Sequence, residues 1–99
     1  MKSKNEEVLD RAAKLYRALG HPLRLEMLLF LAESPSCVHD LTEQTGASQP
    51  LVSQHLRVLR QENLVSGTRS GKETIYQLAD KHVLHVLQDA IDHIKETQS

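Results

Sequence analysis

The chain has 99 residues, of which 39% are hydrophobic, and its 12 Lys and Arg against 13 Asp and Glu give a formal net charge of −1. A chain of this length fits one small domain with a modest core, which a partner subunit would help to stabilise. The charge excludes a general polyanion binder but leaves room for a local basic surface. With 3% aromatic residues and no Trp, stacking platforms for single-stranded nucleic acid are not expected.

The chain has one cysteine, so it forms no internal disulfide, which suits a reducing compartment. Its apolar runs are shorter than a membrane span, and the opening stretch MKSKNEEVLD lacks the apolar run of a signal peptide. We therefore expect a soluble, cytoplasmic protein with no membrane partner.

Two helices are expected before residue 35. In the first, at about residues 6–18, apolar side chains recur at helical spacing, and Gly20 ends the helix. The second begins at Pro22, which suits the first helical turn, and ends at Ser34-Pro35. The stripe of the first helix comprises Val8, Leu9, Ala12, Ala13, Leu15, Tyr16 and Leu19. The second is rich in leucine and is expected at the centre of the fold, through Leu25, Leu28, Leu29 and Leu31.

The next two segments have the pattern of a helix-turn-helix. Ser36 is expected to cap a short helix that closes at Gly46, and Ser48 to cap a longer helix with Pro50 in its first turn. A short helix, a tight turn containing glycine and a longer helix are typical of this motif. His55, beside the buried stripe, is expected to pack or hydrogen-bond rather than to contact bases. The predicted buried stripe of the longer helix is Leu51, Val52, Leu56 and Leu59.

After Asn63 the sequence alternates between apolar and polar residues, which predicts strands. Two short strands are expected at about residues 64–69 and 73–78, joined by a turn at Ser70-Gly71. A hairpin directly after a helix-turn-helix makes a winged helix. The predicted fold class is therefore α+β, mainly α, with about five helices and a two-stranded β-hairpin wing.

Asp80 is expected to cap a last helix at about residues 80–96. We expect one winged helix-turn-helix domain over residues 1–99, which forms a homodimer because such motifs usually read two half-sites with twofold symmetry. The first and last helices are the candidate dimer surfaces. On the last helix, apolar residues at 4, 3, 4 spacing form a seam: Val83, Leu87, Ala90 and Ile94, with Leu84 and Ile91 beside them.

Polar side chains on the longer helix of the motif suit the major groove of DNA. Gln can pair with adenine and Arg with guanine through two hydrogen bonds, and Ser can bond a phosphate or a base edge. An ordinary polar face would account for any one of these residues, but the order of elements favours binding of double-stranded operator DNA. The predicted DNA-binding residues are Ser48, Gln49, Ser53, Gln54 and Arg57 on the helix, with Arg69 and Lys72 at the hairpin tip.

Histidines and carboxylates lie at both ends of the last helix. His82 and His93 are eleven residues apart, which is about three turns or roughly 16 Å along the axis. One ion cannot join them within a chain, because a zinc–nitrogen bond is only about 2.0–2.1 Å long. If the helix pairs antiparallel with its twofold mate, Asp80 and His82 of one chain meet His93 and Glu96 of the other. Two sites of four N/O ligands result, which suits tetrahedral Zn²⁺.

The same side chains also fit roles without a metal. Asp80 is a good N-cap in either case, and Glu96 could be part of a solvated helix end. His85 is more often a surface histidine than a ligand, so it is left out of the predicted site and kept as a second choice.

Three segments resemble the ArsR/SmtB family of winged-helix transcriptional repressors: RALGHPLRLEMLLFL, CVHDLTEQTGASQPLVSQHLRVLRQENLV and RSGKETIYQL. The resemblance covers nearly the whole chain. It implies a dimer that binds operator DNA without metal and releases it when metal binds. It also implies a zinc site formed by a D-x-H pair, Asp80 and His82, and an H-x-x-E pair, His93 and Glu96, from the other subunit. Zinc-bound His93 would then donate its other ring N–H to the carbonyl near Gln54.

A second family site uses thiolates in a C-x-C-D or C-x-x-D pattern, completed by Cys or His from the N-terminal arm. The chain matches it in part, with Cys37, His39 and Asp40, but the arm MKSKNEEVLD offers neither Cys nor His. We favour a structural role for Cys37, with a weak metal site through these three residues as the alternative.

The predicted function is a metal-sensing repressor, not an enzyme, that controls metal efflux or homeostasis genes and takes no small organic substrate. Zn²⁺ is the expected metal, with Co²⁺ or Ni²⁺ also compatible with the ligands. Two alternatives stay open. One is a repressor of the same fold that responds through Cys37 by thiol chemistry or a soft metal. The other is a metal-binding module without a role on DNA.

Overall fold

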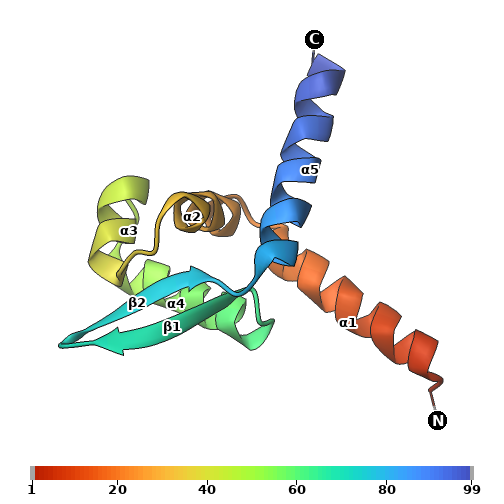
Figure 1. Cartoon of the computed structure of the whole chain (residues 1–99), viewed down its shortest axis with the longest axis horizontal. Helices are drawn as coiled ribbons and strands as arrows, with labels where there is room; N and C mark the ends of the chain where they lie inside the picture. Colours follow the sequence, from red (N-terminus) through yellow and green to blue (C-terminus); the bar gives the residue numbers. More distant parts are fainter. Residues whose placement is uncertain (1, 99) are drawn as a thin grey trace.

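The computed structural model describes residues 2–98 and contains the predicted winged helix-turn-helix (Figure 1). Four helices precede the hairpin and one follows it, which confirms the predicted fold class. The elements are α1 (Lys4–Leu19), α2 (Pro22–Glu33), α3 (Val38–Thr45), α4 (Gln49–Gln61), β1 (Val65–Ser70), β2 (Glu73–Leu78) and α5 (Lys81–Gln98).

Side-chain caps fix the beginnings of the helices. Ser3 Oγ accepts a hydrogen bond from the Glu6 amide at 3.2 Å, so α1 begins at Lys4, two residues before the predicted start. Asp80 Oδ1 accepts from the Val83 amide at 3.0 Å, as predicted for the cap of α5. These polar side chains satisfy backbone amides that the first helical turn leaves without partners.

The predicted cap of α3 is wrong by one residue. Cys37 is the N-cap, and the Asp40 carboxylate accepts a hydrogen bond from the Cys37 amide. Ser36 instead pairs with Tyr76 in an antiparallel bridge, with N···O distances of 3.0 and 2.8 Å. This bridge ties the α2–α3 link to β2, and that pairing removes Ser36 from the helix.

The core lies where α2, α3 and α4 meet the start of the hairpin. Met27 and Leu28 on α2 are fully buried, as are Leu41 on α3 and Leu59 on α4. The other buried members of the predicted α4 stripe, Val52 and Leu56, are confirmed, but the prediction for Leu51 is wrong, because its side chain is 40% exposed. The buried stripe of α4 therefore packs into the core beside α3, and the opposite face of α4 is exposed to solvent.

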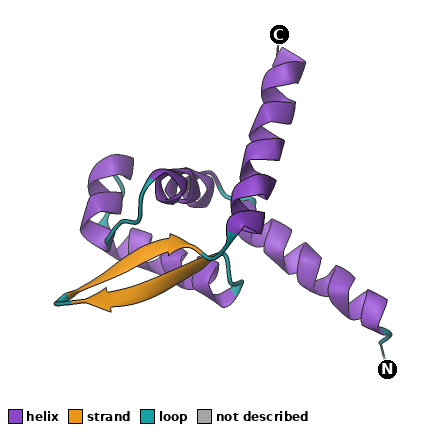
Figure 2. Cartoon of the chain, viewed as in Figure 1, coloured by secondary structure: helices purple, strands orange, loops and turns teal. Residues whose placement is uncertain are grey.

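The wing is an antiparallel pair in which Ser70 faces Glu73, so the turn residues are Gly71 and Lys72, one position later than predicted. Gly71 has φ of +63°, which glycine adopts without the steric cost of a Cβ. In Figure 2 the two orange strands lie alongside α4, and their turn projects beyond the beginning of that helix.

Helices α1 and α5 project away from the rest of the fold (Figure 1). Some apolar residues of α5 pack into the core of the chain, and others are exposed to solvent. Val83 and Leu87 of the predicted α5 seam are buried in the core of their own chain, which corrects their assignment to the dimer seam. Val86, which was not in the predicted seam, is 38% exposed, and Ile94 is 49% exposed. The exposed apolar face of α5 is therefore Val86, Ala90 and Ile94, with Ile91 half-buried beside it.

Candidate DNA-binding and metal-binding sites

The predicted reading residues of α4 lie on its free face. Ser48 caps the helix through its Oγ, which accepts from the Leu51 amide, and Gln49, Ser53, Gln54 and Arg57 are all exposed. The buried stripe on the other side of α4 fixes the rotation of the helix, so these side chains point to solvent. An α-helix of this kind fits the width of a major groove, about 12 Å.

The tip of the wing carries the two predicted backbone-contacting residues. Arg69 donates from Nε to the Gly71 carbonyl at 3.0 Å, which holds the guanidinium at the turn. Lys72 occupies the second turn position and is exposed. Both cations thus stand at the far end of the hairpin.

A hollow of about 460 Å³ lies between α4 and Tyr76 of the wing, and we call it the wing hollow. Ser53, Arg57 and Arg60 line it on the α4 side, and Tyr76 lines it on β2. The Arg60 guanidinium lies 6.0 Å from the centre of the Tyr76 ring, within the range of a cation–π contact. Gly67, opposite Tyr76, leaves space for this ring, since a Cβ there would lie 3.2 Å from a Tyr76 ring carbon.

Arg60 and Tyr76 were missing from the predicted DNA-binding residues. The sequence carried a signal for Arg60, which lies three residues after Arg57 and therefore shares its side of the helix. It carried none for Tyr76, because only the pairing of the strands places its ring against α4.

His55 is the buried polar residue of α4, and its partner Arg24 links three helices. Arg24 Nη1 lies 3.2 Å from His55 Nδ1, and the His21 and His55 ring centres are 4.5 Å apart. The same Arg24 donates from Nε to the Ala18 carbonyl and from Nη2 to the Arg17 carbonyl. The guanidinium therefore joins the end of α1 to α4, which confirms the expected packing and hydrogen-bonding role of His55.

Burial lowers the pKa of His55, and the neighbouring His21 and the positive charge of Arg24 lower it further. A neutral imidazole accepts a hydrogen bond at one nitrogen, whereas an imidazolium has only donors. Since Arg24 supplies the N–H, His55 must accept at Nδ1, so this contact requires the neutral ring.

We expect the protein to lose stability as the pH falls from about 7.5 to about 5.5, in part through His55. The folded pKa of His55 lies below the unfolded value, so the unfolded chain takes up the proton first. This contribution is complete above the unfolded pKa of about 6.5 and is lost as the pH falls below it. Urea unfolding at both pH values measures the change. His55→Gln, whose amide oxygen can accept from Arg24, should show a smaller loss, and an equal loss in both proteins would contradict this role.

The predicted metal ligands lie at the two ends of α5. His82 Nδ1 is 3.7 Å from Asp80 Oδ1, and the His82 side chain is 94% exposed. His93 and Glu96 lie three turns farther along, and both are exposed. Among residues 2–98 of a single chain, His, Cys, Asp and Glu side chains nowhere gather in a group of three that would hold a metal ion. The structure thus brings the first pair together, and within one chain the second pair stays apart from it.

The residues of the secondary candidate site do not converge. The Cys37 side chain is buried at the start of α3, and the Asp40 carboxylate accepts from the Cys37 amide. His39 points elsewhere, with Nε2 3.1 Å from a carboxylate oxygen of Glu43. Buried packing and capping thus account for Cys37 and Asp40.

An apolar groove of about 200 Å³ runs between α5 and the junction of α1 and α2. Tyr16 and Leu19 line it on α1, Leu29 on α2, and Ala90 and Ile94 on α5. Leu29 was predicted in the core but is 39% exposed, because it faces this groove. The groove coincides with the helices expected to form the dimer.

No helix within residues 2–98 is long and apolar enough to cross a membrane.

The fold agrees with that of solved winged-helix proteins. A homodimeric winged helix-turn-helix DNA-binding domain from Mycobacterium bovis, described as a possible ArsR-family regulator, has a TM-score of 0.90 and 25% identity, over 97% of this chain and 89% of that one. NolR from Sinorhizobium fredii has a TM-score of 0.83 and 32% identity, over 95% and 93% of the two chains.

Sequence comparisons agree with the structure. The family model described as "Bacterial regulatory protein, arsR family" matches residues 21–66, which span the beginning of α2 to the beginning of β1. The transcriptional repressor SmtB of Mycobacterium tuberculosis is 48% identical over 91% of this chain and 67% of its own length. The transcriptional regulator NmtR of the same organism is 43% identical over 90% and 74%. With these similarities and the winged helix, the chain belongs to the ArsR/SmtB family of DNA-binding transcriptional repressors, whose members are not enzymes.

Proposed function

We propose that this repressor senses zinc: the metal-free homodimer binds operator DNA, and Zn²⁺ bound between its subunits weakens that binding. The observation that carries the proposal is the pair formed by Asp80 and His82 at the first turn of α5. A carboxylate and an imidazole this close, with the imidazole almost fully exposed, leave donor atoms available to an ion from outside the chain.

The second pair of ligands, His93 and Glu96, would come from a partner subunit. His82 and His93 share nearly one face of α5 but are about 16 Å apart along it. If two α5 helices run antiparallel, the Asp80 end of one meets the His93 end of the other. The exposed apolar face of Val86, Ala90 and Ile94 lies beside these histidines and gives the helices a reason to pair.

The chemistry of the donor set fits zinc. Two carboxylates and two imidazoles, from Asp80, His82, His93 and Glu96, are nitrogen and oxygen donors of the kind that tetrahedral Zn²⁺ accepts. Co²⁺ and Ni²⁺ take similar ligands, so the response to each must be compared. The resemblance of these residues to the D-x-H and H-x-x-E pairs of zinc sensors in the family supports the same assignment.

The reading of DNA is assigned to α4 and the wing. Gln49, Ser53, Gln54 and Arg57 face outward from α4 and would enter the major groove, and Arg69 and Lys72 would contact the backbone. The metal ligands are on a different helix, so zinc must act through the geometry of the dimer. A metal-bound His93 that donates its second ring N–H to the carbonyl near Gln54 would link the two sites.

The test is a zinc titration of the protein bound to fluorescently labelled operator DNA. We expect zinc to lower the affinity for DNA, and coupling free energies of about 1–3 kcal/mol correspond to a decrease of roughly 5- to 150-fold. Cobalt, nickel and cadmium are titrated in parallel to rank the metals. DNA affinity that is the same with and without each metal would refute metal sensing, although the protein would remain a DNA-binding repressor.

Cys37→Ser tests the competing repressor that responds through its thiol. Because the Cys37 side chain is buried and His39 pairs with Glu43, we expect the variant to keep the zinc response of the unmodified protein. Loss of the response in this variant alone would favour the thiol alternative.

A further inference from the structure

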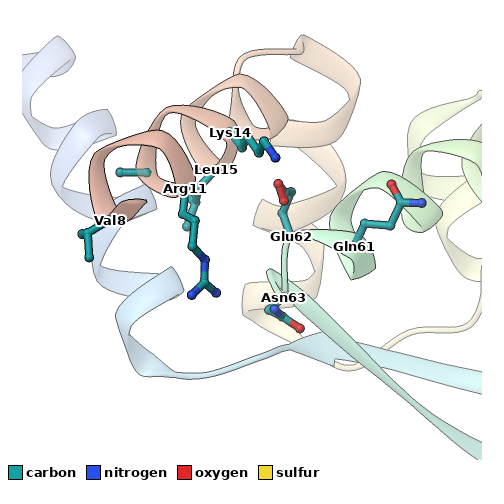
Figure 3. A pocket seen from close by; sticks show the side chains of 8 residues that line it. Val8, Arg11, Lys14, Leu15, Gln61, Glu62 and Asn63 are labelled. Carbon is teal, nitrogen blue, oxygen red and sulfur yellow. The ribbon is translucent and has the colours of Figure 1, made fainter. Parts of the chain in front are cut away.

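Two more hollows lie on the side of α4 opposite the wing. The first, of about 450 Å³, lies between α1 and the end of α4, and Figure 3 shows Arg11 and Lys14 projecting into it from α1, with Glu62 and Asn63 across from them. The second, of about 260 Å³, lies where α1, α2 and α4 meet and is lined by Lys14, Arg17 and Arg24. We call the pair the α1 hollows.

Gln61 lines both α1 hollows and the wing hollow as well. This side chain lies at the middle of the exposed face of α4, since successive residues turn by about 100° and the buried stripe is opposite it. The three hollows therefore form a continuous surface that wraps around the end of α4, with one flank toward the wing and the other toward α1.

This surface is strongly basic. Six of the chain's 12 Lys and Arg line its hollows, whereas Glu62 is the only carboxylate residue that does so among the residues described. In a chain with a net charge of −1, such a concentration is not a consequence of composition. The six cations are Arg11, Lys14, Arg17 and Arg24 on the α1 flank, with Arg57 and Arg60 on the wing flank.

The arrangement matches the shape of a major groove. The groove is about 12 Å wide and is bounded by a phosphate backbone on each side, and a helix with side chains has a diameter of about 10–12 Å. A helix inserted into the groove therefore has phosphates along both flanks. The wing lies along one flank, where it can contact phosphates, and the cations of α1 lie along the other flank.

We propose that Lys14 and Arg17 on α1 form a second DNA-backbone contact surface, which binds the phosphates on the side of α4 away from the wing. The proposal rests on the assignment of α4 as the reading helix and adds α1 to the DNA interface. Contacts of this kind position the protein and raise its affinity without reading sequence.

Arg24 holds this surface in place. Its guanidinium bonds the Ala18 and Arg17 carbonyls at the end of α1 and His55 on α4, so it fixes the end of α1 against the reading helix. We therefore treat Arg24 as a positioning residue, with Lys14 and Arg17 as the phosphate contacts.

The salt dependence of DNA binding tests the proposal. Each phosphate contact adds about 0.9 to the steepness of log affinity against log salt concentration. Lys14→Ala or Arg17→Ala removes two contacts per dimer, so each should make the slope shallower by about 1.8. The loss of affinity should be the same on operator DNA and on an unrelated duplex. Lys4→Ala, on the same helix but outside the hollows, is the matched control and should leave the slope unchanged.

Two results would overturn the proposal: an unchanged slope in both variants, or a loss of affinity that follows dissociation of the dimer in sedimentation experiments. The release of the unmodified protein from operator DNA by zinc is measured in the same series. If zinc releases the unmodified protein and the slopes do not change, only the α1 contact is wrong. If the slopes change but zinc has no effect, the α1 contact stands and zinc sensing is wrong.

Discussion

His93→Ala is expected to stay on operator DNA at zinc concentrations that release the unmodified protein. His93 supplies one of the two imidazoles of each proposed site, and without it the remaining donors are mostly carboxylates, which hold Zn²⁺ less well. The substitution also removes the ring N–H that would reach the carbonyl near Gln54. The decrease of roughly 5- to 150-fold in DNA affinity expected on zinc addition should therefore disappear.

The measurement is fluorescence anisotropy of labelled operator DNA with the protein, titrated with zinc. His85→Ala is the matched control, because His85 is an exposed histidine on the same helix but lies outside the proposed site. We expect it to respond like the unmodified protein, and both variants should bind DNA normally without metal. A full zinc response in His93→Ala would exclude the proposed ligand set, and loss of the response in His85→Ala would place the site elsewhere on α5.

The order of the elements could be predicted because each boundary depends on neighbouring residues. Pro22 and Gly46 mark the beginning of α2 and the end of α3, and Ser48 and Asp80 cap α4 and α5 as expected. Such signals act within one helical turn, so a sequence shows them directly.

The misplaced boundaries depend on contacts between distant residues. Ser36 has the chemistry of an N-cap, but its pairing with Tyr76, forty positions later, moves the cap to Cys37. The seam of α5 was misassigned for a similar reason. Val83 and Ile94 belong to one apolar face by spacing, and only the packing of α5 on the hairpin directs Val83 into its own core.

The candidate sites divide in the same way. Exposure of Gln49, Ser53 and Arg57 followed from the buried stripe of α4, and the approach of His82 to Asp80 followed from their spacing in sequence. The basic α1 flank could not be predicted from the sequence, because Lys14 and Arg17 on α1 come together with Gln61 only through the tertiary fold. The meeting of two α5 helices involves a second chain and stays a prediction.

Ile94→Glu is expected to dissociate the proposed homodimer. Ile94 is 49% exposed in the single chain and lines the apolar groove with Tyr16 and Ala90, so its side chain is available to a partner subunit. A twofold interface would bury two of the new carboxylates, each at a cost of several kcal/mol. Since about 1.4 kcal/mol is a factor of ten, dimerisation should weaken by at least about a hundredfold. Sedimentation equilibrium without zinc measures this change.

Gln88→Glu is the matched control, because it adds the same charge to an exposed position of α5 outside the apolar groove. It should remain dimeric, and both variants should keep their helical circular dichroism, since neither residue belongs to the buried core. A monomer presents one reading helix and can occupy only one half-site at a time. The Ile94 variant should therefore lose more affinity for the two-half-site operator than for a single half-site. If Ile94→Glu remains dimeric, the interface lies outside this groove. The antiparallel pairing of α5 that brings Asp80 and His82 to His93 and Glu96 would then be wrong as well.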